Sequence, residues 1–262
     1  MTLSLPQFIN GERVTAATPH ESLNPSDTNE IVARYPDGGV AEVDAAVEAA
    51  RKAFPAWSGA SPEVRSDILD KIGSTILARK EKLGELLSRE EGKTLPEGIG
   101  EVARAGRIFK YFAGEALRRH GQNLESTRPG VEAATFREAV GVFGLITPWN
   151  FPIAIPAWKA APAMAFGNTV VIKPAGPTPA IAAALADIIF ECGTPAGVFN
   201  MVFGPGRVGA AIAAHKGISG VSFTGSQGVG AQVAAAALAH NARIQLEMGG
   251  KNPIVILDDA DL

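Results

Sequence analysis

The spacing of apolar residues becomes helical after residue 40. Residues 1–40 combine short apolar pieces with Pro, Asn, Gly and Thr, which is typical of extended segments and turns. Apolar residues then recur at helical spacing, at Val43, Val47, Ala50 and Phe54. Because proline cannot donate a backbone hydrogen bond, Pro55 is expected to end this first helix.

A capping signal predicts where a second helix begins. Ser61 offers a side-chain oxygen, Pro62 suits the first turn, and Glu63 adds an acidic group to that turn. Apolar residues follow at helical spacing, at Val64, Ile68, Ile72 and Ile76. A further helix is expected over about residues 97–118. Residues 120–140 are rich in turn formers and predict a hairpin or protruding arm, with a strand over 132–140.

From residue 141 onward, apolar runs alternate with helical segments. The runs predicted as strands are 141–146, 169–173, 198–203, 218–223, 244–247 and 253–257. Helices are expected over about 178–191 and, after the fourth strand, to about residue 239. This alternation predicts an α/β fold, with a mainly parallel sheet and helices on both faces. We therefore divide the chain into a helical N-terminal part at 1–119, the arm at 120–140 and a Rossmann-like core at 141–262.

Composition and charge narrow the class of function. The 262 residues carry 24 Lys and Arg against 27 Asp and Glu, so binding to nucleic acid is not expected. The 46% of hydrophobic residues suit a folded chain rather than a disordered one. The apolar stretches are too short to cross a membrane, and the N-terminus lacks the pattern of a secretory signal. A single cysteine favours a reducing, cytoplasmic location, and no spacing of histidines indicates a metal site.

Polar residues follow several predicted strands, at the edge where parallel sheets bind ligands. Thr224, Gly225 and Ser226 link a strand to a helix, and the free N–H groups at that helix start suit a pyrophosphate. The alternative is a serine N-cap, with glycines for close packing of the helix. Lys173 ends another strand, where it either binds a ribose or phosphate or is a solvated charge.

Three further residues are candidates for catalysis. Glu247 ends a strand and is a candidate general base, although a solvated carboxylate is equally consistent with its position. Asn150 lies between two prolines, where its amide either turns a local corner or donates to a developing oxyanion. Cys192 stands at a predicted helix C-terminus, which disfavours a thiolate, so we expect it to be structural.

Several of these segments together resemble the aldehyde dehydrogenase family. The matching motifs stand in the family's order: PWNFP at 148–152, WK at 158–159, GN at 167–168, KP at 173–174, FTGS at 223–226 and LEMGGK at 246–251. The resemblance extends over essentially the whole chain. It implies a Rossmann-like NAD(P)-binding fold and a reaction in which a cysteine thiolate attacks an aldehyde. A hydride then passes to a nicotinamide ring, and the resulting thioester is hydrolysed.

The resemblance also assigns roles to individual residues. It implies that Asn150 donates to the oxyanion and that Glu247 activates the hydrolytic water. Contacts with NADP or NAD are implied for Thr147, Trp149, Lys173, Gly176, Gly204, Thr224, Gly225, Ser226, Val229, Leu246 and Gly249. Among these, Lys173 resembles the ribose contact and Ser226 the pyrophosphate contact. No metal is implied.

The sequence departs from the family at two points. The family's nucleophilic cysteine lies in a separate catalytic domain, a few dozen residues after the glutamate motif, whereas the fifteen residues after Glu247 contain no cysteine. We therefore expect a chain that lacks the catalytic domain and is inactive alone. NAD-preferring members commonly carry Glu three residues after the strand-end lysine, where this sequence has Gly176. Without that carboxylate to repel a 2′-phosphate, NADP is favoured.

Substrate and partners follow from the resemblance alone. Overall similarity suggests a small semialdehyde, such as 2-oxoglutarate semialdehyde, as the substrate. The arm resembles the family's oligomerisation arm, which implies a homodimer or homotetramer for the full-length protein. The alternative is a standalone nucleotide-binding module without catalysis, which the mass of the natural polypeptide would distinguish from the enzyme.

Overall fold

A seven-stranded sheet organises the chain. The structure is a computed structural model that describes residues 2–118 and 121–261. In these residues the strand order of the sheet is β12-β11-β8-β9-β10-β2-β3. The strands are β2 (Gln7–Ile9), β3 (Glu12–Val14), β8 (Val142–Ile146), β9 (Thr169–Lys173), β10 (Phe199–Met201), β11 (Gly220–Gly225) and β12 (Arg243–Met248). From β12 to β10 all pairs are parallel, and β2 and β3 add an antiparallel edge. The expected α/β fold with a mainly parallel sheet is confirmed.

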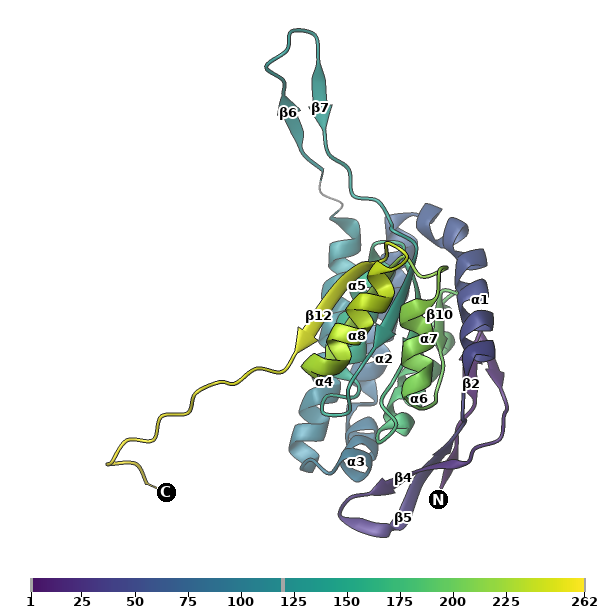
Figure 1. Cartoon of the computed structure of the whole chain (residues 1–262), viewed down its shortest axis with the longest axis vertical. Coiled ribbons are helices and arrows are strands. Elements are labelled where there is room, and N and C mark those ends of the chain that lie inside the picture. Colours follow the sequence, from purple (N-terminus) through teal and green to yellow (C-terminus); the bar gives the residue numbers. More distant parts are fainter. Residues whose placement is uncertain (1, 119–120, 262) are drawn as a thin grey trace.

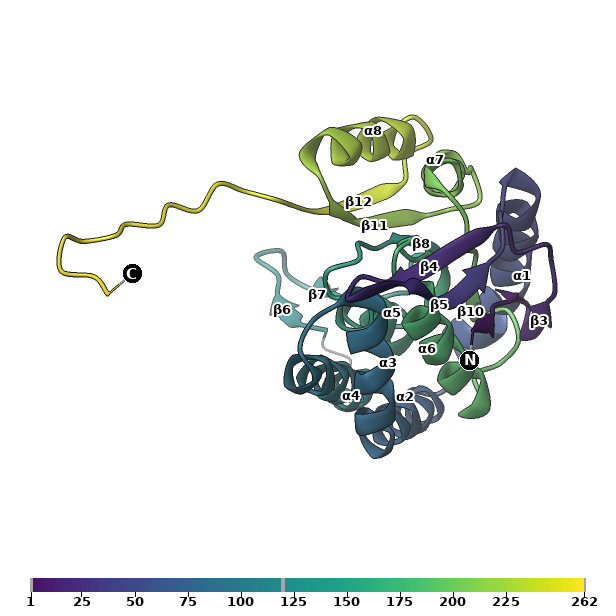
Figure 2. The same ribbon diagram turned by 90° about the horizontal axis from the view of Figure 1, so that it is seen from below.

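Helices cover both faces of this sheet (Figures 1 and 2). One face carries α1 (Val40–Gly59), α7 (Gly206–Ala214) and α8 (Gln227–Leu238). The other carries α5 (Ala154–Ala165) and α6 (Pro179–Glu191), with α2 (Pro62–Ala78), α3 (Lys80–Glu91) and α4 (Leu95–Leu117) packed behind them. Successive side chains of β9 point to opposite faces of the sheet and pack against both helical layers. Val170 and Ile172 face α5 and α6, whereas Val171 faces α1 and α7.

The remaining strands lie outside the main sheet. A small sheet contains β1 (Leu3–Ser4), β5 (Asp27–Tyr35) and β4 (His20–Asn24), in that order. The predicted hairpin is present as β6 (Asn123–Glu125) and β7 (Glu132–Ala134), and it stands away from the body (Figure 1). Its second strand is shorter than the predicted 132–140. The boundary that we placed between residues 119 and 120 lies outside the described residues.

The prediction that Pro55 ends the first helix is wrong. The helix continues to Gly59, because Pro55 is exposed and the turn after it is anchored by a buried tryptophan. The Trp57 indole N–H donates to the carbonyl of Met164, 3.2 Å away in α5. By contrast, the predicted cap at Ser61 is confirmed, since its hydroxyl accepts from the backbone N–H of Val64 at 3.3 Å.

The prediction of a strand over 253–257 is also wrong. This segment has no regular structure, and its side chains are exposed, Ile254 to 88%. After β12 the chain leaves the body of the protein (Figure 1), so no strand within the described residues lies beside it. A run of β-branched residues favours a strand only where a neighbour supplies hydrogen bonds and an apolar face.

Glu90, at the end of α3, completes the hydrogen bonding at the start of α6. Its buried carboxylate accepts from the backbone N–H groups of Ala180 at 2.7 Å and Ile181 at 2.9 Å. Thr178, the N-cap residue of α6, makes no such bond with its side chain. These first-turn N–H groups have no partner inside the helix, so a carboxylate from α3 replaces the missing cap. Burial nevertheless raises the pKa of Glu90 to about 7.

The raised pKa predicts a pH dependence of stability. Since the folded state binds this proton more tightly than the unfolded state, the free energy of unfolding should fall as pH rises from about 4.5 to 7. In Glu90→Gln, which keeps one acceptor oxygen but does not titrate, the decrease in the free energy of unfolding over this pH range should be smaller by up to about 3 kcal/mol. Urea unfolding at pH 5 and pH 7 checks this, with the exposed Glu48→Gln as the control. An equal pH response of the parent chain and Glu90→Gln would contradict the assignment.

Candidate active site

The carboxyl ends of four parallel strands bring predicted site residues to one edge of the sheet. Thr147 directly follows β8, while Lys173, Thr224 and Glu247 lie at or near the ends of β9, β11 and β12. The Thr147 N–H donates to the Lys173 carbonyl at 3.2 Å, which joins two of these ends. The chain builds β8, β9 and β10 in one direction and then crosses back to place β11 on the other side of β8. Ligands bind at such a switch point.

The start of α8 is consistent with both alternatives left open by the sequence, a serine N-cap and a binding site for a pyrophosphate. Ser226 is the N-cap residue, and its hydroxyl accepts from the Val229 N–H at 3.5 Å. Ser226 and Val229 are nevertheless exposed, and the first turn lies open at the edge of the sheet. The Gln227 side-chain amide donates to the Gly249 carbonyl at 3.0 Å, which fixes the loop after β12 against this turn. An anion is therefore able to approach the N-terminus of a capped helix.

Several polar groups beside Lys173 have no partner. Among the described residues the Lys173 ammonium makes no hydrogen bond or ion pair, and burial lowers its pKa. The hydroxyls of Thr147 and Thr178 are likewise buried without a hydrogen bond. Buried polar groups are normally satisfied, so unpaired ones indicate a missing ligand or water. These groups, together with the α8 turn, fit the ribose and phosphates of a dinucleotide.

The glycines predicted to bind a cofactor have different surroundings. Gly176 lines a cavity of about 450 Å³ together with Trp149 and Tyr35. A Cβ atom at Gly176 would lie 2.8 Å from the Tyr35 hydroxyl. Gly204 has a φ of +151°, and a Cβ there would lie 2.6 Å from a methyl group of Val208, so its packing requires glycine. Gly204 does not line the cavity that contains Gly176.

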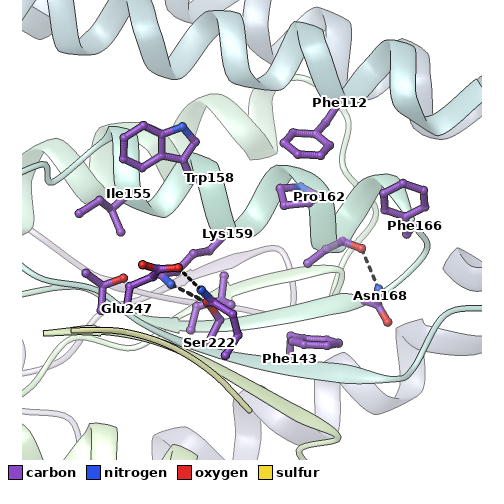
Figure 3. A pocket seen from close by; sticks show the side chains of 14 residues that line it. Phe112, Phe143, Ile155, Trp158, Lys159, Pro162, Phe166, Asn168, Ser222 and Glu247 are labelled. Atoms are coloured by element: carbon purple, nitrogen blue, oxygen red, sulfur yellow. Dashed lines mark hydrogen bonds between the residues drawn. The ribbon is translucent and has the colours of Figure 1, made fainter. Parts of the chain in front are cut away.

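A larger cavity of about 720 Å³ lies under α5, on the face of β8, β11 and β12 (Figure 3). Thr224 and Glu247 point into it, as alternate positions on paired strands should. The Gln245 amide donates to the Glu247 carboxylate at 2.7 Å. Leu246, also predicted as a cofactor contact, has its side chain on the opposite face, against the core beneath α8.

Lys159 is the residue of this cavity that our sequence analysis missed as a functional group. It points from α5 toward Ser222 and Glu247 (Figure 3), and its ammonium donates to the Ser222 hydroxyl at 2.7 Å. Burial lowers the pKa of Lys159 to about 8, and the negative charge of Glu247 opposes this shift. A signal was available, because Lys159 is the one charged residue in the otherwise apolar sequence of α5.

A second cavity of about 490 Å³ adjoins the first, since both are lined by Phe112 and Trp158. Its wall is the face of α4 that carries Arg104 and Arg107. The Arg104 guanidinium lies 5.9 Å from the centroid of the Trp158 ring. In the part of the chain that the structure describes, neither arginine makes an ion pair or a hydrogen bond. Two unpaired cations therefore lie beside the cavity that contains Glu247.

Asn150 and Cys192 lie in different parts of the molecule. Asn150 is exposed in the loop after β8, and its backbone carbonyl accepts from the Lys93 ammonium at 3.1 Å. Cys192 is buried at the C-terminal end of α6, 3.5 Å from the Thr75 hydroxyl. Because α6 begins near the carboxyl edge and has 13 residues, its end is roughly 20 Å from that edge. The site thus does not include Cys192.

Neither a metal cluster nor a membrane-spanning helix is present among the described residues. Within residues 2–118 and 121–261, no group of three or more His, Cys, Asp or Glu side chains is placed to hold a metal ion. None of the described helices is both long and apolar enough to cross a membrane.

The sequence matches the model of the aldehyde dehydrogenase family over residues 13–262. The chain belongs to the aldehyde dehydrogenase family. It is 46% identical over 258 residues to the alpha-ketoglutaric semialdehyde dehydrogenase of Bacillus subtilis. That alignment covers 97% of this chain and 53% of the relative. The human 2-aminomuconic semialdehyde dehydrogenase is 39% identical, with coverage of 99% and 54%.

Solved structures agree with this membership. Betaine aldehyde dehydrogenase from Staphylococcus aureus in complex with NAD+ is 36% identical and superposes with a TM-score of 0.92. The match covers 99% of this chain and 52% of that one. The chain therefore spans about half the length of the relatives that it matches.

The contacts of Lys159 predict how its charge depends on Glu247. In lysine labelled with ¹³C at Cε, NMR should show Lys159 titrating near pH 8. Glu247→Gln should shift this midpoint to lower pH, because the carboxylate stabilises the ammonium. Lys173, whose pKa is lowered by burial alone, is the internal control and should not move. An unchanged Lys159 midpoint in Glu247→Gln would show that the two charges do not interact.

Proposed function

We propose that this chain supplies the cofactor-binding, oxyanion-binding and general-base groups of an NAD(P)-dependent semialdehyde dehydrogenase. The observation that carries the proposal is the cavity that contains Glu247 and continues past Trp158 to two unpaired arginines. Membership of the family supports the reaction type, and two semialdehyde dehydrogenases among the relatives support the class of substrate.

The proposed reaction uses two residues of this chain at successive stages. When a cysteine thiolate adds to the aldehyde carbon, the carbonyl oxygen becomes negative, and the Asn150 side-chain amide donates to it. A nicotinamide cofactor, which Lys173, Thr147 and Ser226 would hold, would supply the hydride acceptor for the step that leaves a thioester. Glu247 then takes a proton from the water that hydrolyses this thioester. Lys159, hydrogen-bonded to Ser222, keeps a positive charge beside that carboxylate below about pH 8.

We infer that the nucleophile is not Cys192. A catalytic cysteine has to be a thiolate within reach of the aldehyde, whereas Cys192 is buried and lies at the far end of α6 from the site. The 262 residues contain no other cysteine. The nucleophile is therefore proposed to be a residue that this sequence does not include, and these residues alone are proposed to be inactive.

The arginines of α4 account for a semialdehyde substrate. A semialdehyde of this kind carries a carboxylate at the end opposite the aldehyde. Guanidinium groups bind carboxylates through paired, charge-assisted hydrogen bonds, and an arginine without an ion pair is free to do so. Because the Arg104 guanidinium lies over the Trp158 ring, its charge is placed at the junction of the two cavities. The aldehyde end is then directed toward the cavity that contains Glu247.

The substrate proposal predicts a selective effect of Arg104. In an enzyme that joins this chain to its nucleophile, Arg104→Met should raise KM for 2-oxoglutarate semialdehyde by about 10- to 100-fold, because a charged hydrogen bond is lost. Oxidation of pentanal, which has no carboxylate, should change little. Initial rates of reduced cofactor formation provide the measurement. Arg118→Met, at the C-terminal end of α4, and Cys192→Ala are controls, and equal losses with both substrates would contradict carboxylate binding.

The surroundings of Gly176 support NADP as a cofactor. No carboxylate at this position repels a 2′-phosphate, and the unpaired Lys173 ammonium lies on the preceding strand. The Tyr35 hydroxyl occupies the space beside the missing Cβ, and the Tyr35 ring stacks on His20 with 5.1 Å between centroids. We propose that the chain accepts both cofactors and favours NADP.

The cofactor proposal is testable on this chain without catalysis. Gly176→Glu should raise the Kd of NADP relative to that of NAD by about 10- to 100-fold. The reason is the repulsion between the new carboxylate and the 2′-phosphate at an effective dielectric constant of about 20. Gly176→Gln is the matched control, since it meets the Tyr35 hydroxyl equally but adds no charge. Fluorescence titration gives both constants. If Gln shifts the ratio as much as Glu, the effect is steric and position 176 does not face the 2′-phosphate.

The hairpin of β6 and β7 supports a proposal about assembly. It stands off the body (Figure 1), and it exposes Leu124, Val131 and, just after β7, Phe136. Exposed strand edges with apolar side chains are suited to pairing with another chain. We propose that the complete protein is a homodimer or homotetramer in which this hairpin makes contacts between subunits.

A further inference from the structure

Lys93 connects four different groups around the loop that carries Asn150. Its side chain is only 13% exposed, and its ammonium donates to the Glu101 carboxylate at 2.6 Å and to the backbone carbonyl of Asn150 at 3.1 Å. The same ammonium lies 4.5 Å from the centroid of the Phe151 ring and 3.6 Å from the Glu91 carboxylate. The Lys93 ammonium thus contacts both Asn150 and Phe151, the two residues joined by the peptide bond after Asn150.

Glu101 fixes the other end of the same loop. Its carboxylate is 2% exposed, and Oε1 accepts from the backbone N–H groups of Ile153 and Ala154, both at 3.1 Å. These N–H groups stand at the start of α5, and Ile153, the N-cap residue, has no side-chain cap of its own. Glu101 and Lys93 therefore hold the loop from Asn150 to α5 at both ends.

We propose that Lys93 and Glu101 are positioning residues that set the direction of the Asn150 side-chain amide. The proposal rests on the function proposed above, in which this amide donates to the oxyanion. Asn150 is exposed, and no hydrogen bond to its side chain is found in the described part of the chain. The loop backbone determines the point from which this side chain projects, and Lys93 holds that backbone at the Asn150 carbonyl and through the ring of Phe151. An oxyanion donor acts only when it is aimed before the charge develops.

A purely structural role gives a different expectation. If the pair merely caps α5, its loss lowers the stability of the protein and reduces the amount of folded enzyme. If it aims Asn150, its loss lowers kcat in the folded enzyme and leaves KM nearly unchanged, because the oxyanion forms only in the transition state. The effect must also depend on the presence of the Asn150 amide.

The test is a double-mutant cycle in the enzyme that joins this chain to its nucleophile. Lys93→Met and Asn150→Ala are made singly and together, with kcat, KM, the Kd of the cofactor and the thermal midpoint measured for each. Lys93→Met should lower kcat by about 10- to 100-fold, since small misplacements of an oxyanion donor cost this much. In the Asn150→Ala background the same change should lower kcat by no more than about 2-fold. Lys93→Arg, which keeps the cation, should restore part of the loss.

Lys110→Met is the matched control. Like Lys93, Lys110 donates to a carboxylate, that of Asp70, at 2.6 Å, but it lies within α4 on the surface away from the loop. Its loss should leave kcat unchanged. If Lys93→Met does not fold, Glu101→Gln supplies a second variant, because it keeps an acceptor for the α5 N–H groups and removes the charge that holds Lys93.

Each outcome bears on one claim. Independent effects of Lys93→Met and Asn150→Ala, or a loss that follows the thermal midpoint alone, would overturn the positioning role. If Asn150→Ala itself leaves kcat unchanged, the oxyanion role fails, and the proposed function has to be revised along with the inference. A fall in kcat for Asn150→Ala with none for Lys93→Met or Glu101→Gln rejects only the inference.

Discussion

Parallel pairing of β8 with β9 on one side and β11 on the other is the constraint on which the site depends. Parallel strands all end at the same edge, so residues 26 to 100 positions apart in the sequence, such as Thr147, Lys173 and Glu247, come together there. Such strands require a crossover helix between them, and each crossover places a helix N-terminus at the edge where ligands bind. The start of α8, with Ser226 as its cap, is one of these.

The helical layer behind the sheet controls how these helices begin. Glu90 accepts the first N–H groups of α6, and Glu101 accepts those of α5. Both carboxylates are buried and come from α3 and α4, which precede the core in the sequence. A buried carboxylate is costly unless it is fully hydrogen-bonded, so each one ties the N-terminal part to the core in a single arrangement.

The sequence was sufficient for the elements whose own residues determine them. The alternating strands, the cap at Ser61 and the polar strand ends are local signals, and each is present in the structure. Predictions failed where distant partners decide the outcome. Pro55 is tolerated because Trp57 packs on α5, and the 253–257 segment is no strand because no strand among residues 2–118 and 121–261 lies beside it.

The same distinction applies to the site. Glu247 and Thr224 were candidates because they stand at the ends of predicted strands. The lone charge of Lys159 in an apolar helix was a signal too, but only the packing of α5 on the sheet shows that it points at Glu247. The contacts of Lys93 and Glu101 with the Asn150 loop join segments more than 45 residues apart, and no spacing in the sequence encodes them.

Helix α4 contributes neighbouring side chains to two different parts of the molecule. Glu101 faces inward to the loop of Asn150, while Arg104, three residues later, faces the cavity beside Trp158. Three residues correspond to about 300° of rotation and about 4.5 Å of rise in an α-helix, so the two side chains project only about 60° apart, from adjacent turns of the same helix. Any shift of α4 relative to the core therefore displaces both the Arg104 guanidinium and the loop that carries Asn150. Under the function proposed above, a substitution that alters how α4 packs on the core should therefore change substrate choice and turnover together.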